Sequence, residues 1–260
     1  MNARVTVLGC GTSHGVPMIG CRCATCRSTD PRDKRLRPSI YVDVADRIRI
    51  LVDTSIDLRQ QALAHGIDRV DAVLFTHAHA DHILGLDDLR SFNELQGTPM
   101  PCYGNAEAWH AIKRSFFYVF EGALQRGGGI PQLVAHEIDG VIDLDGLRVV
   151  PVPLWHGKLP ILGYRFGNFS YLTDCNAIPE ASWPLIAGTE ILILDALRDA
   201  PHETHFTIAE ALAVVDRLKP TRTFFTHMTH DLPYAATNAR LPAGVELAYD
   251  GLVFDIEVEA

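Results

Sequence analysis

The sequence lacks long hydrophobic runs and has few basic residues for its acidic content. The apolar stretch near the N-terminus, in MNARVTVLGCGTSHG, spans only a few residues and is too short for a signal-peptide core or a membrane span. We therefore expect a cytoplasmic protein that does not enter the membrane. Lys and Arg total 23 against 32 Asp and Glu, a net charge of −9, which argues against binding long nucleic acid by neutralising its phosphates.

Cysteines are also few, and low-complexity segments and linkers are absent. Six cysteines in 260 residues do not indicate a disulfide framework, and three of them lie in CRCATC at 21–26, a spacing typical of a metal knuckle. A hydrophobic content of 47% supplies a sizeable core. The sequence therefore predicts one domain over residues 1–260, with a cysteine knuckle at 21–26.

Short apolar, β-branched runs that end abruptly in a polar residue predict mostly buried strands: VTVLG, IRILVDT, DAVLFTH, LRVVPVPLWH, FSYLTD, EILILDA and TFFTH. Helical patterns lie between some of them. One covers 55–65, with Ser55 as its N-cap, and another follows the capping-box spacing from Thr207 to Glu210. Residues 106–130 predict an aromatic helix followed by the loop RGGGI. This mixture of strands and helices indicates an α/β fold class.

Residues with nitrogen and oxygen donor atoms follow four of these strands: His77, His79, Asp81, His82, His156, Asp174 and His227. In an α/β sheet, such strand ends converge on one edge, where ligand sites form. Imidazole and carboxylate suit zinc, manganese or iron. Seven donors exceed the needs of one open tetrahedral ion but fit two ions roughly 3.5 to 4 Å apart, with Asp174 able to bridge them. Burial without a metal would leave several of these polar groups unpaired.

The ordered motifs THAHADH, LTD and FTH, with His156 between the first two, resemble the metallo-β-lactamase superfamily. This resemblance implies a four-layer αββα fold, with two facing mixed β-sheets flanked by helices and a dinuclear site at their shared edge. It also implies which residues bind which ion: His77, His79 and His156 one ion, and Asp81, His82 and His227 the other, with Asp174 bridging them. Asp53 in LVDTS would contact the ligands and hold them in place without binding a metal itself.

The segments GCGTSHGVPMIGCRCATC and FTHMTHD look like the PhnP-like branch, which includes the phosphoribosyl 1,2-cyclic phosphate phosphodiesterase of phosphonate breakdown. This likeness implies a structural zinc that pins the N-terminal loop to the C-terminal part, held by Cys21, Cys23, Cys26 and His230. It also implies a general acid/base at His205, with His202 as the alternative. A histidine there could protonate a leaving alkoxide, because its ordinary pKa of about 6.5 suits neutral pH. The predicted catalytic residues are therefore His205 and the ligand Asp81.

The expected activity is hydrolysis of a small phosphodiester, cyclic ribosyl or linear, by a hydroxide on two zinc or manganese ions. Two alternatives stay open: an endoribonuclease that processes transfer-RNA 3′ ends, and a non-catalytic zinc-binding interaction module. The substrate and the oligomeric state, a homodimer included, are not determined. No role can be assigned to His14, and nothing selects a phosphate-binding arginine among Arg90, Arg114 and Arg126. His65, His110 and His136 are interpreted as surface or hydrogen-bonded core residues.

Overall fold

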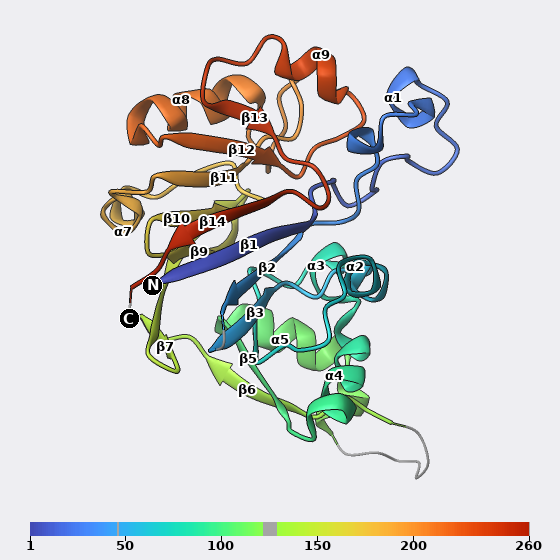
Figure 1. The fold of residues 1–260 in the computed structure, drawn as a ribbon, viewed down its shortest axis with the longest axis vertical. Helices are drawn as coiled ribbons and strands as arrows, with labels where there is room; N and C mark the ends of the chain where they lie inside the picture. The colour runs from blue at the N-terminus through green and yellow to red at the C-terminus, as the bar shows by residue number, and fades with distance from the viewer. Residues whose placement is uncertain (46, 122–128, 260) are drawn as a thin grey trace.

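The computed structural model describes residues 1–45, 47–121 and 129–259, and their strands form two mixed sheets of seven strands each (Figure 1). In the first sheet three antiparallel pairs are followed by three parallel pairs. Its strands, in spatial order, are β14 (Val253–Glu257), β1 (Asn2–Gly9), β2 (Ser39–Val44), β3 (Ile48–Val52), β4 (Ala72–Leu74), β5 (Met100–Gly104) and β6 (Leu133–Glu137).

The second sheet repeats this sequence of pairings, three antiparallel and then three parallel. Its strands, in spatial order from the antiparallel end, are β7 (Ile142–Leu144), β8 (Leu147–His156), β9 (Leu159–Phe166), β10 (Phe169–Leu172), β11 (Ile191–Asp195), β12 (Arg222–Thr226) and β13 (Val245–Leu247). Counted this way, β4 corresponds to β11. Two segments with similar sequences, LFTHAHADH and FFTHMTHDL, begin within β4 and β12, so their likeness does not mark equivalent positions.

Helices flank the two sheets on opposite sides, which confirms the αββα layers (Figure 1). On the first sheet's side, a buried apolar cluster joins strand residues Leu51 and Val73 to helix residues Leu58 and Trp109. The larger cluster fills the space between the sheets and reaches Ile208 on the second sheet's helices. The α-helices are α1 (Ala24–Arg27), α2 (Leu58–His65), α3 (Ala80–Ile83), α4 (Leu89–Gln96), α5 (Ala106–Ser115), α6 (Phe117–Phe120), α7 (Trp183–Ile186), α8 (Ile208–Leu218) and α9 (Tyr234–Asn238).

Short 3₁₀ turns complete the fold at η1 (Pro31–Asp33), η2 (Leu86–Asp88) and η3 (Glu180–Ser182). Among the described residues, no helix combines the length and the apolar character needed to cross a bilayer.

Two of the predicted helices have different bounds in the structure. Helix α2 begins at Leu58 rather than at Ser55, because the Ser55 hydroxyl accepts a hydrogen bond from the Asp57 N–H and donates one to Gln61. The aromatic helix is interrupted at Phe116, where φ is −116° and ψ is 41°, and so forms α5 and α6. The predicted glycine loop falls largely within 122–128, outside the described residues. The capping box of α8, in contrast, is present as predicted.

Candidate metal centre

The predicted ligands and the supporting Asp53 lie at or just beyond the carboxyl ends of strands from both sheets. Asp53 follows β3, Asp174 follows β10 and His227 follows β12. These three residues have φ values of 63°, 57° and 59°, in the left-handed region that non-glycine residues seldom adopt. Each strand therefore turns sharply at its end, and functional sites are where such backbone conformations concentrate.

One potential ligand group consists of His77, His79 and His156, whose ligand atoms lie within 4.8 Å of one another. His77 and His156 are buried and His79 is exposed, so the group opens to solvent at His79. Burial lowers the pKa of His77 well below its ordinary value and that of His156 to about 4. These rings are therefore neutral and offer lone pairs. The buried Nε2 of His77 has no hydrogen-bond partner among the described residues, as expected of a metal-binding nitrogen.

The Nδ1 atom of His156 lies 2.9 Å from the carbonyl oxygen of Thr204. Since a carbonyl only accepts, Nδ1 carries the proton in this contact and Nε2 keeps its lone pair. A backbone contact of this kind fixes both the tautomer and the ring orientation of a metal-binding histidine.

A second potential ligand group consists of Asp81, His82, Asp174 and His227, all buried and with ligand atoms within 4.8 Å of one another. Asp174 connects the two groups. Its Oδ2 lies 3.2 Å from Nε2 of His82 and 3.1 Å from Nε2 of His227. The same oxygen lies 3.7 Å from Nε2 of His77 in the first group. One carboxylate oxygen thus faces donors of both groups, the position that a bridging ligand requires.

Opposite charges dominate the second group. Burial raises the pKa of Asp174, but His227 and His82 outweigh it and hold that pKa well below its ordinary value. Burial also lowers the pKa of His227, yet chiefly Asp174 raises it to about 10. The group thus pairs carboxylates with imidazole rings that these carboxylates make more basic. Because metal ligands must be deprotonated, a divalent cation bound here takes over the role of protons on these rings. The donor set fits such a cation.

Asp53 holds the second group from behind. Its fully buried Oδ2 lies 2.7 Å from Nδ1 of His82, and its oxygens accept hydrogen bonds from the N–H and hydroxyl of Thr76 at 2.8 and 2.7 Å. With Nδ1 engaged in this way, Nε2 of His82 faces Asp174. This is the geometry of a carboxylate that orients a metal-binding histidine.

His205 borders both ligand groups. Its ring centroid lies 4.7 Å from that of His156 and 4.6 Å from that of His227. Nδ1 of this buried ring lies 3.1 Å from Oδ1 of Asp195, whose Oδ2 accepts the Phe206 N–H at 2.8 Å. The sequence reasoning missed Asp195, although it ends the strand EILILDA as other acidic residues end theirs. The alternative residue, His202, is exposed, and its Nδ1 accepts from the Thr204 N–H at 3.3 Å.

The predicted knuckle residues also lie together. The Sγ atoms of Cys21, Cys23 and Cys26 lie 3.2, 3.3 and 3.5 Å from Nδ1 of His230. The Cys26 N–H, more than the His230 ring, lowers the pKa of the Cys23 thiol to about 6. Three sulfurs and one imidazole nitrogen form a donor set that suits tetrahedral zinc.

Other candidate residues lie outside these groups. His14 is exposed, and Arg90 pairs with Asp87 at 3.1 Å. Arg114 lines an open surface hollow with His110. Arg126 lies outside the described residues. Among the described residues, Arg90 is therefore already paired with a carboxylate.

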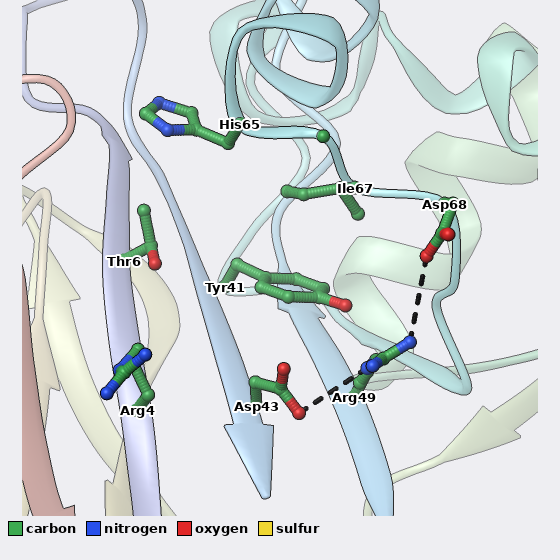
Figure 2. A pocket seen from close by; sticks show the side chains of 9 residues that line it. Arg4, Thr6, Tyr41, Asp43, Arg49, His65, Ile67 and Asp68 are labelled. Carbon is green, nitrogen blue, oxygen red and sulfur yellow. Dashed lines mark hydrogen bonds and ion pairs between the residues drawn. The ribbon is translucent and has the colours of Figure 1, made fainter. Parts of the chain in front are cut away.

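A separate pocket of about 180 Å³ lies on the first sheet, between its strands and the end of α2 (Figure 2). His65 and Tyr41 line it. Three of its charged side chains pair with one another, since Arg49 lies 3.4 Å from Asp43 and 3.7 Å from Asp68. None of the predicted metal ligands lines this pocket, so we do not place the reaction there.

A sequence model of the β-lactamase superfamily domain matches residues 48–228, a range that contains all seven predicted ligands of the active site. The chain belongs to the metallo-β-lactamase superfamily. Within this superfamily of metal-dependent hydrolases it is PhnP-like. A structure described as the crystal structure of a new diphosphatase from the PhnP family is similar to this chain, with 46% sequence identity and a TM-score of 0.93. The alignment covers 100% of this chain and 99% of that one.

Two curated superfamily relatives have other names. A protein named octanoyltransferase from Porphyromonas gingivalis is 36% identical over 96% of this chain and 51% of its own length. The chain thus spans about half the length of that relative. A ribonuclease Z from Pyrobaculum calidifontis is 24% identical, over 83% of this chain and 88% of its own length.

Proposed function

We propose that this protein is a dinuclear metallohydrolase that cleaves a P–O bond in a small compound whose phosphorus carries two substituents. The observation that carries this proposal is Asp174, whose Oδ2 lies within 3.7 Å of His77 in one ligand group and 3.1 Å of His227 in the other. When bound, two zinc or manganese ions would lower the pKa of a shared water towards about 7 and stabilise the attacking and leaving oxygens. The first ion would be held by His77, His79 and His156, the second by Asp81, His82 and His227, with Asp174 bridging.

The proposed general acid is His205. The Asp195 carboxylate accepts a hydrogen bond from Nδ1 of His205. The other ring nitrogen, Nε2, can then hold a proton for the leaving oxygen. The His205 ring lies next to rings of both ligand groups, which supports this role for it at the edge where phosphate would bind. Asp195 acts as a positioning residue, because it fixes the tautomer and the orientation of the ring.

The substrate class follows from chemistry shared by two candidate reactions. The similar PhnP-family structure is that of a diphosphatase, and the likeness of the motifs is to a phosphodiesterase. In a phosphodiester and in a disubstituted diphosphate alike, the attacked phosphorus carries two bridging oxygens and one negative charge. A small substrate is favoured because the net charge of −9 repels long nucleic acid. The ribonuclease Z relative keeps transfer-RNA processing as the second candidate.

The test is a substrate panel for the manganese-loaded and the zinc-loaded protein, followed by phosphorus NMR. The panel contains 5-phosphoribosyl 1,2-cyclic phosphate, a dinucleoside diphosphate, bis(p-nitrophenyl) phosphate, precursor transfer RNA and the monoester p-nitrophenyl phosphate. We expect turnover of disubstituted phosphates and none of the monoester. Cleavage of transfer RNA alone would support the second candidate, and silence on every substrate would favour the non-catalytic zinc module.

A leaving-group comparison tests His205. His205→Ala should lower kcat by about 10² to 10⁴ for an alkoxide leaving group and far less for p-nitrophenolate, which departs without a proton. His110→Ala, at an exposed histidine on α5, is the matched control and should leave both rates unchanged. Equal losses for both leaving groups would assign His205 a structural rather than a proton-donating role.

A further inference from the structure

Two chain segments lie next to each other beside the proposed general acid. One is the turn 157–158 between β8 and β9, which directly follows the ligand His156. The other is the loop 201–204, which directly precedes His205. We refer to these two segments together as the rim loops.

The fold fixes the rim loops to each other. Oδ1 of Asn176 accepts the Gly157 N–H at 2.8 Å, and Nδ2 of the same amide donates to the Glu203 carbonyl at 2.9 Å. A Cβ at Gly157 would lie 2.9 Å from Cγ2 of Thr204, so the two segments are in close contact. Asn176 follows the bridging residue Asp174 by two positions. The rim loops therefore keep a fixed position relative to the ligand groups.

The contacts of His202 decide which of its nitrogens carries the proton. Its Nδ1 accepts the Thr204 N–H at 3.3 Å, and because a backbone N–H only donates, the ring proton is on Nε2. Partial burial, with His205 and Arg198 adding to it, lowers the pKa of His202, so the ring is neutral at neutral pH. The exposed ring lies 5.1 Å, between centroids, from the buried ring of His205. His202 thus supplies an N–H donor on the exposed side of the proposed general acid.

The charges around the rim loops favour an anion. Lys158 is exposed and forms no ion pair with a described residue. Arg198, directly ahead of the loop, donates to backbone carbonyls and so keeps its positive charge. Asp199 pairs with Arg240 at 2.7 Å, which leaves the Glu203 carboxylate against these two cations. Ammonium and N–H donors together are a common means of binding phosphate oxygens.

The small substrates considered for the reaction share a second phosphate. In 5-phosphoribosyl 1,2-cyclic phosphate it lies at the other end of the sugar, and in a disubstituted diphosphate it adjoins the attacked phosphorus. A protein of net charge −9 repels such a compound overall. Local donors and cations beside the metal centre would offset this repulsion.

Resting on the proposed function, we propose that the rim loops bind a second phosphate of the substrate. The Nε2–H of His202 donates a hydrogen bond to one of its oxygens, and Lys158 contributes a positive charge. Both are specificity-determining residues, whereas the proton for the leaving group comes from His205. The ligand groups thus determine the reaction, and the rim loops determine which phosphates undergo it.

The test measures kcat and KM of the metal-loaded protein for two esters with the same leaving group. These are p-nitrophenyl thymidine 5′-phosphate and its 3′-phosphorylated analogue, which adds a second phosphate across one pentose. Since p-nitrophenolate departs without a proton, a change in rate reports on binding and not on proton donation. We expect the wild type to prefer the phosphorylated ester by roughly tenfold or more in kcat/KM.

Variants of the two residues should reduce this preference. His202→Ala and Lys158→Ala should each raise KM for the phosphorylated ester by roughly fivefold or more, with kcat little changed and the other ester unaffected. His202→Gln keeps an N–H donor and Lys158→Arg keeps the charge, so both should retain most of the preference. Lys113→Ala, at an exposed residue of α5, removes the same charge elsewhere and should behave as the wild type.

The outcomes separate the two proposals. Equal kcat/KM for both esters in the wild type would overturn the assignment of the rim loops and leave the metallohydrolase intact. A preference that survives His202→Ala or Lys158→Ala would overturn the role of that residue, and an equal loss in Lys113→Ala would assign the preference to net charge. A fall in kcat for both esters in His202→Ala would place His202 in the reaction rather than in recognition. If the wild type cleaves neither ester nor bis(p-nitrophenyl) phosphate, the proposed function itself fails.

Discussion

Asp250 is a half-buried carboxylate outside the two ligand groups, at a junction of three chain segments. Its Oδ1 accepts the Cys10 N–H at 3.0 Å at the end of β1, and its Oδ2 accepts the Leu36 N–H at 2.7 Å ahead of β2. Burial nevertheless raises its pKa to about 7, because two backbone hydrogen bonds only partly replace the lost water. The charge state of this junction therefore changes near neutral pH.

We predict that Asp250 makes the folded protein less stable as pH rises from about 4 to 7. With a pKa of about 7, against an ordinary value of about 3.9, the folded state binds more protons than the unfolded state in this window. The free energy of unfolding should fall there by at most about 1.4 kcal/mol per pH unit from this residue. Asp250→Asn should remove that contribution, as measured by urea unfolding at pH 5 and pH 7.5.

Asp255→Asn, at an exposed carboxylate on β14 that pairs with Arg4 at 3.2 Å, is the control and should follow the wild-type pH dependence. If wild type and Asp250→Asn change in parallel between the two pH values, the burial of Asp250 does not control its ionisation.

At the scale of elements, the four-residue helix α3 depends on close contact for its position. It carries Asp81 and His82, and a helix this short has little stability of its own. Gly85, which follows it, donates its N–H to the Thr54 carbonyl at 3.0 Å. A Cβ at Gly85 would overlap the Ser55 carbonyl oxygen and lie 2.8 Å from Cβ of Leu58. The absence of a side chain therefore lets α3 approach the loop after β3.

We expect Gly85→Ala to displace α3 and so weaken the second ligand group. The φ of Gly85 is −83°, which alanine adopts freely, so any effect comes from the lost approach and not from backbone strain. Activity should fall at least tenfold, with partial loss of one bound metal, while the circular dichroism spectrum stays that of the folded protein. Leu84→Ala, at a residue that is 44% exposed, is the neighbouring control. Wild-type metal content and rate in Gly85→Ala would show that α3 tolerates the shift.

At the scale of the whole molecule, distant segments meet around the metal-binding residues. The guanidinium of Arg35, only 1% exposed, donates to the carbonyls of Thr229 and Leu232 on the loop that carries His227 and His230. The N-terminal loop is thus joined to the second sheet's ligand loop. The candidate knuckle adds a second connection between the same two segments.

We predict three tightly bound ions per chain, two at the sheet edge and one at the knuckle. Element analysis of the dialysed protein should give this ratio, and Cys23→Ser should lower it to two. Chelation of all ions should lower the free energy of unfolding by several kcal/mol, since free metal at 1,000 times Kd contributes about 4 kcal/mol per site. A ratio of one ion per chain, or a Cys23→Ser ratio equal to the wild type, would contradict this distribution.

The sequence by itself determined the fold class, the superfamily and seven of the fourteen strands that the structure describes, because each of these depends on local patterns. The four donors from His77 to His82 lie within six residues, and the predicted strands coincide with alternating or continuous apolar runs. Only the tertiary structure decided which residues meet across the chain. It paired His205 with Asp195 and placed Asp174 between the two ligand groups. It also set His202 beside His205. These relations depend on strand order and on the approach of helices, which no short stretch of sequence specifies.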